Sequence, residues 1–157
     1  MRKKNIPIFL FFVLLTFCTK DPELFPEYFF ELNLTRKLTG AEAKNFVNRL
    51  HFNSVTNEKN EIGFYGGVKG NAIIYVTFYE NESVSIKNYK KMTEKISPEN
   101  SVFTNGSYIS VSGRNIYRTY GIGQTHYVFT SSNKLFWISA ETNWAQDFLT
   151  EYLKILD

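Results

Sequence analysis

Apolar side chains recur every three to four residues in three stretches of the chain, which is the spacing of one face of an α-helix. The stretches lie at about 40–51, 83–96 and 144–156, and each is predicted to be a helix. The last one carries a dense stripe of large apolar residues: Trp144, Phe148, Leu149, Tyr152, Ile155 and Leu156. Asn143 is expected to cap its start, with Gln146 three residues on. The stripe predicts a helix that packs into the core.

Between the helices the chain shows short runs of β-branched and aromatic residues, which favour strands. The runs are 61–65, 72–79, 102–109, 115–120, 125–130 and 135–140. Turn residues separate them, and Asn105-Gly106 is expected to close a hairpin within 102–109, because this pair tolerates the positive φ of a tight turn. The predicted fold class is α+β: an antiparallel sheet of about five to six strands with about three helices packed on one face.

The N-terminus follows a different pattern. Arg2, Lys3 and Lys4 precede an apolar stretch, Ile6–Phe17, which ends at Cys18. This is the layout of a secretory signal peptide, and the apolar stretch is too short to span a bilayer. The residues just before Cys18 are not the small ones that the general signal peptidase requires.

Leu15-Thr16-Phe17-Cys18 resembles the lipobox of bacterial lipoproteins, which has Leu three residues before the acylated Cys. The resemblance implies that the Cys18 thiol receives a diacylglyceryl group and that the chain is cut before it and acylated again. Phe17 departs from the family pattern, which has a small residue there. Two or three acyl chains hold a protein firmly on a membrane. An uncleaved anchor, or an apolar start that is never lipidated, is the alternative.

This interpretation divides the chain into a signal peptide (1–17), the lipidated Cys18 with a tether (18–33), and one α+β globular domain (34–157). Several tether residues are aromatic, and a freely disordered linker would be poor in them. We therefore expect the tether to dock on the domain. Cys18 is the only cysteine, so the predicted mature fold has no disulfide and depends on its apolar core.

The charge balance narrows the class of partner. The chain has 18 Lys and Arg and 15 Asp and Glu, and loss of Arg2, Lys3 and Lys4 with the signal peptide leaves 15 of each. A nucleic-acid-binding protein shows a basic excess or stripe, so that class is excluded. The same balance argues against a polybasic membrane patch.

Candidate chemistry is sparse. The chain has two histidines, no spacing of metal ligands and no nucleophile–base motif, so no metal, cofactor or enzymatic activity is predicted. His51 ends a predicted helix, where an imidazolium suits the helix dipole. The best polar cluster is a candidate ligand site on one predicted hairpin: Arg114, Arg118, Gln124 and His126. The alternative is a solvated sheet face with a hydrogen-bonded histidine.

The segments Gly123–Tyr127 and Leu135–Ser139 resemble uncharacterised bacterial envelope proteins, a resemblance that implies no activity. The sequence thus predicts a membrane-anchored lipoprotein at the cell envelope, outside the cytoplasm, whose domain binds an envelope protein or ligand without catalysis. One alternative is a ligand-binding or hydrolytic domain that uses Arg118 and His126, and another is a structural or assembly factor. In enteric bacteria, an Asp directly after the acylated Cys resembles a signal for retention in the inner membrane. Thr19 follows Cys18 here, so the sequence allows an outer-membrane location.

Overall fold

The structure is a computed structural model that describes residues 22–50, 57–96 and 101–157. Its elements are β1 (Tyr28–Phe29), β2 (Leu32–Leu38), α1 (Gly40–Leu50), β3 (Lys59–Gly67), β4 (Gly70–Phe78), α2 (Glu82–Lys95), β5 (Thr104–Val111), β6 (Arg114–Gly121), β7 (Gln124–Ser131), β8 (Lys134–Glu141) and α3 (Ala145–Leu153). Among these residues, no helix is long and apolar enough to cross a membrane.

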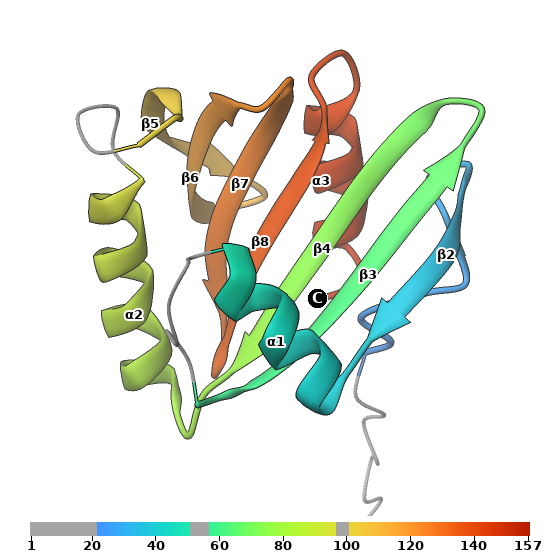
Figure 1. Cartoon of the computed structure of the whole chain (residues 1–157). Helices are drawn as coiled ribbons and strands as arrows, with labels where there is room; N and C mark the ends of the chain where they lie inside the picture. Colours follow the sequence, from blue (N-terminus) through green and yellow to red (C-terminus); the bar gives the residue numbers. More distant parts are fainter. Residues whose placement is uncertain (1–21, 51–56, 97–100) are drawn as a thin grey trace, which may run out of the picture.

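All the strands form one antiparallel sheet in the order β1-β2-β3-β4-β8-β7-β6-β5. The chain builds one half of the sheet up to β4 and crosses through α2 to the far side. It then returns strand by strand until β8 pairs with β4 (Figure 1). The two central strands are therefore far apart in the sequence, and their pairing joins the two halves.

The general α+β class holds, but the predicted sheet of five to six strands is wrong, because the sheet has eight. The missed strands are β1 and β2. β1 has only two residues, too few to show an alternating pattern. β2 has only three apolar residues in seven. Its pairing with β3 shifts register between Leu34 and Arg36, and a bulge of this kind breaks the alternation that marks a strand.

The prediction that all the helices pack on one face of the sheet is also wrong. α1 and α2 cover one face of the sheet and α3 covers the other (Figure 1). In β4, Ile73 and Tyr75 pack with the α1 side, whereas Ile74 and Val76 pack with the α3 side. Successive strand residues point to opposite faces, so the unbroken apolar run of β4 requires a cover on both.

Asn105-Gly106 does not close a hairpin. Asn105 has a φ of 54° and lies inside β5, where the pairing with β6 shifts register between Thr104 and Ser107. The Tyr117 hydroxyl sits where a side chain on Gly106 would begin. The positive φ of Asn105 therefore occurs in a bulge within β5 rather than in a hairpin turn. The hairpin turn falls instead at Ser112-Gly113, where both residues have a positive φ.

α3 is part of the core, as its stripe predicts. Phe148 and Tyr152 are fully buried, and the Phe148 ring packs edge-on against Phe29 and Phe30. The predicted Asn143 cap is wrong, because the helix starts one residue later with Trp144 at the cap position and no side-chain hydrogen bond there. The Trp144 indole N–H instead donates to the Lys69 carbonyl at 3.1 Å.

Residues assigned to the tether pack against the domain from Pro22 onward. The Tyr152 hydroxyl donates to the Leu24 carbonyl at 2.8 Å, and the Tyr65 hydroxyl donates to the Pro26 carbonyl at 3.2 Å. Phe25 is buried over Gly63, where an added Cβ would lie 2.6 Å from its ring. The docking expected from the aromatic residues is therefore present, and only residues 19–21 separate Cys18 from the docked segment.

Phe148→Ala should lower the free energy of unfolding by about 3–5 kcal/mol, because it leaves a cavity beneath α3. Ile122→Ala is the matched control, since Ile122 is 78% exposed at a turn and its truncation should cost less than about 0.5 kcal/mol. Urea unfolding of both variants measures the difference. Equal stability of Phe148→Ala and the wild type would contradict the core role of α3.

Candidate functional site

The structure does not bring the predicted polar cluster together. Arg118 lies opposite Tyr127, and His126 lies opposite Thr119, in the pairing of β6 with β7. Directly opposed residues share a face of the sheet, and adjacent residues alternate. Because Tyr127 belongs to the core under α3, Arg118 points to that face and His126 points to the α2 face. The sheet itself separates the two side chains.

His126 is buried, and both of its ring nitrogens have partners. Nδ1 lies 3.0 Å from the Trp137 indole nitrogen, and Nε2 lies 2.9 Å from the Gly121 carbonyl oxygen. An indole N–H can only donate, so Nδ1 is the acceptor and Nε2 carries the proton. Burial lowers the pKa of His126, and the Gly121 hydrogen bond opposes this shift without cancelling it. The imidazole is therefore neutral, with no free nitrogen for proton transfer.

The other predicted residues are spread over the sheet. Arg114 pairs with the Asp157 carboxylate and donates to the Ser131 hydroxyl at 3.3 Å. The Arg118 guanidinium lies 5.5 Å from the centre of the Tyr120 ring, and its buried Nε has no hydrogen-bond partner among the described residues. Gln124 lies at the end of the sheet that holds the β3–β4 and β6–β7 turns, which we call the distal end.

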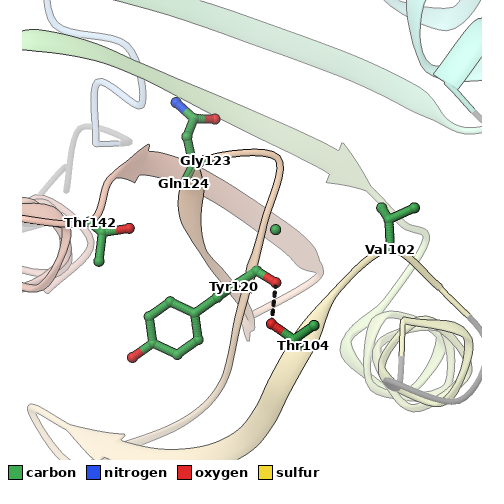
Figure 2. Close-up of a pocket in the computed structure, with 7 residues that line it drawn as sticks. Val102, Thr104, Tyr120, Gly123, Gln124 and Thr142 are labelled. Carbon is green, nitrogen blue, oxygen red and sulfur yellow. Dashed lines mark hydrogen bonds between the residues drawn. The ribbon is translucent and has the colours of Figure 1, made fainter.

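The distal end carries a shallow hollow of about 260 Å³ (Figure 2). Its lining is neutral: Val102, Thr104, Tyr120, Gly121, Gly123, Gln124 and Thr142. The Thr104 hydroxyl donates to the Tyr120 carbonyl at 3.3 Å. Of the predicted site residues, only Gln124 contributes to this hollow.

Apolar side chains stand exposed on the distal end. Val68 tops the β3–β4 turn, Ile122 tops the β6–β7 turn, and Val102 borders the hollow; all three are exposed. A single exposed apolar residue is ordinary on a protein surface. Val102 and Ile122 lie at the hollow, since Val102, Gly121 and Gly123 line it, and Val68 lies at the same end of the sheet. This end is therefore a candidate contact surface for another protein.

The opposite, basal end holds a cleft of about 300 Å³ that the sequence analysis missed. Cross-strand pairing sets Lys59 opposite Phe78, and Phe78 opposite Lys134. These three residues line the cleft together with the docked N-terminal segment and a second strand pair: Pro22, Glu23, Leu24, Phe25, Lys37 and Glu61. We call it the lysine cleft.

Glu61 lies beneath the lysines of this cleft. Its two carboxylate oxygens lie 2.7 Å from the Lys59 ammonium and 3.4 Å from the Lys37 ammonium. Burial raises the pKa of Glu61, but the hydrogen bond and charge of Lys59 and the charge of Lys37 outweigh it, so the pKa falls below its ordinary value. Lys134, whose ammonium lies 5.9 Å from the Phe78 ring centre, has no ion pair among the described residues.

Metal-binding chemistry has no visible support in the described part of the chain. Residues 22–50, 57–96 and 101–157 contain no group of three or more His, Cys, Asp or Glu side chains placed to hold a metal ion. The predicted lipidation site, Cys18, and His51 lie outside the described residues.

Comparison with known proteins defines the fold alone. No family model and no curated protein matches the sequence. A solved structure from Thermotoga maritima, a GTP binding regulator, superposes with a TM-score of 0.55. It is 14% identical in sequence, and the match covers 80% of this chain and 78% of that one. The two proteins share an architecture, and at this identity the likeness carries no site residues across.

The buried His126 should make the protein less stable as the pH falls from about 7.5 to 5.5. Its folded pKa is depressed, so the unfolded chain takes up a proton near the ordinary value of about 6.5 while the folded imidazole stays neutral. The contribution of His126 to the free energy of unfolding is complete above that pH. It is lost below that pH, by at most about 1.4 kcal/mol per pH unit. His126→Asn should remove this component of the slope.

Urea unfolding at a series of pH values measures that slope. His51→Asn serves as the control, because it removes the other histidine of the chain. If His51→Asn flattens the slope and His126→Asn leaves it unchanged, the neutral buried state assigned to His126 is wrong.

Proposed function

We propose that this protein is a bacterial lipoprotein, held at the cell envelope by acylation of Cys18, whose domain binds a partner without catalysing a reaction. The observation that carries the proposal is the lipobox-like segment ending at Cys18, together with a domain that packs from Pro22 onward. Two or three acyl chains on Cys18 would hold such a domain firmly on a membrane.

A binding role agrees better with the site geometry than a hydrolytic one. Arg118 and His126 lie on opposite faces of the sheet, and both nitrogens of His126 are occupied. A general base must reach the proton that it abstracts, so these two residues offer no support for a shared active site. The structural neighbour is named as a GTP binding regulator, which agrees with a binding role in the broad sense only.

The distal end is the surface that we assign to a partner protein. It carries the exposed apolar residues Val68, Val102 and Ile122 and a hollow with neutral hydrogen-bonding groups, which Val102 lines. Interface centres are depleted in charge and rich in apolar contacts. The lysine cleft has the opposite character, and the two ends are expected to meet different surroundings.

Cys18→Ala should abolish incorporation of radiolabelled palmitate and release the protein from the membrane fraction, because the thiol is the acylation site. Phe17→Ala is the matched control, since it places a small residue where lipoprotein signals have one, and it should label at least as strongly as the wild type. Equal labelling of the wild type and Cys18→Ala would refute the anchor.

Photo-crosslinking tests the partner surface in the native envelope. A crosslinking side chain at position 68 or 122 should give a discrete protein adduct, because both positions project from the distal end. The same group at Asn115, which is exposed next to the β5–β6 turn at the basal end, should not give that adduct. The same adduct from all three positions, or none from positions 68 and 122, would argue against a distal partner.

A further inference from the structure

We propose that the lysine cleft rests against the phosphate headgroups of the bilayer in which the protein is anchored, so that the domain is docked on an anionic membrane surface in one orientation. The inference rests on the proposed acylation of Cys18 and goes further, because an acyl anchor alone leaves the orientation of the domain free.

The length of the tether limits how far the cleft can lie from the anchor. Four backbone steps join Cys18 to Pro22, and an extended chain spans at most about 3.5 Å per residue, or about 14 Å in all. Pro22 and Glu23 line the lysine cleft, and Leu24 is hydrogen-bonded to Tyr152. The acylated residue therefore lies within a short reach of the cleft wherever the rest of the domain points.

The charges of the cleft are layered in the order that an anionic surface favours. The side chains of Lys37 and Lys59 are 43% and 61% exposed, whereas Glu61, which they share, is 14% exposed. The carboxylate thus offsets one of the two positive charges from below and leaves the ammonium groups outermost. Lys134 adds a third ammonium. Among the residues that line the cleft, Glu23 is the exposed acid that opposes the lysines, and the exposed Glu80 follows Phe78 by two residues.

Aromatic rings hold two of these ammonium groups in place. The Lys59 ammonium lies 4.5 Å from the centre of the Phe78 ring, and the Lys37 ammonium lies 4.8 Å from the centre of the Phe25 ring. A cation above a ring face is attracted to it. Because Phe25 belongs to the docked N-terminal segment, the tether's entry point and the basic surface form one unit.

A second basic surface is a candidate for contact with the membrane, and the short tether favours the lysine cleft over it. The exposed side of α2 carries several lysines: Lys87, Lys90, Lys91 and Lys95. They lie on the α2 side of the sheet, opposite the face that holds the cleft and the docked N-terminal segment (Figure 1). Electrostatic attraction to a membrane decays over about 10 Å in 0.1 M salt, so the lysines nearest the anchor dominate.

The strength of the docking follows from the number of lysines. Each lysine close to an anionic leaflet favours the docked state about fivefold. Reversing two lysines should therefore shift the equilibrium by at least about 25-fold, which is enough to release the domain from its preferred orientation. In the docked state, the distal end is held away from the bilayer by about the length of a nine-residue strand such as β4, or roughly 30 Å. Release of the domain removes this spacing.

Energy transfer to a headgroup-labelled lipid tests the orientation in the full, acylated chain reconstituted into vesicles. The single native cysteine is the acylation site, so Ser132→Cys and Ile122→Cys can each be labelled uniquely. Ser132 is at the basal end, two residues before Lys134, and Ile122 is at the distal end; both open two-residue turns with a φ of 52° and 54°, so they are matched. Vesicles of phosphatidylcholine with phosphatidylglycerol are compared with pure phosphatidylcholine.

We expect stronger transfer from position 132 than from position 122 in the anionic vesicles, and a smaller difference in the neutral ones. Lys59→Glu with Lys134→Glu should abolish the difference, whereas Lys90→Glu with Lys91→Glu, which changes the charge equally, should leave it intact. Sodium phosphate should weaken the difference no more than sodium chloride of the same ionic strength, because the cleft faces a surface rather than one soluble phosphate.

Three results would overturn the proposal: equal transfer from both positions, loss of the difference only in the α2 variant, or a specific effect of inorganic phosphate, which would assign the cleft to a soluble phosphate ligand. Flotation of the protein with the vesicles and palmitate labelling are scored separately. A protein that floats and labels but shows no preferred orientation keeps the anchor and loses the docking. A chain with no acyl group on Cys18 loses both.

Discussion

The pairing of β4 with β8 is the interaction on which the rest of the structure depends. These strands join over seven residue pairs, from Ala72 with Ala140 to Phe78 with Lys134. Both strands are apolar on both faces, so their register decides which side chains meet α3 and which meet α1 and α2. A slip of one residue would exchange the two sets. Burial of Phe136 on the α3 side and packing of Trp137 on the α2 side favour the observed register over one that is shifted by one residue.

The pairings of neighbouring strands determine which side chains meet at the two ends of the sheet. The β3–β4 and β4–β8 pairings set Lys59, Phe78 and Lys134 in one row, although they lie far apart in the sequence. The β6–β7 pairing assigns Arg118 and His126 to opposite faces, although only seven residues separate them. Proximity along the chain was therefore a poor guide to proximity in space, and alternation within each strand was the better one.

Local patterns predicted the elements that depend on local physics. The three helices follow from the periodicity of their apolar residues. β2 was missed because a bulge interrupts its short apolar pattern, and the two-sided cover was missed although the unbroken apolar run of β4 indicated it. The lysine cleft needed the cross-strand register, and the even overall charge concealed it, because a net charge does not show where the charges gather.

The order in which the strands are made has a consequence for how the protein reaches its native state. Synthesis starts at the N-terminus, so β2, β3 and β4 are complete long before β8, which begins at Lys134. During that interval β4 has a free edge, and the apolar side chains on its two faces lack a neighbouring strand. An exposed apolar edge of this kind recruits other strands, and distant pairings form slowly. Until β8 pairs with β4, the partly built sheet therefore has an edge that favours pairing with other chains, and the arrival of β8 covers that edge.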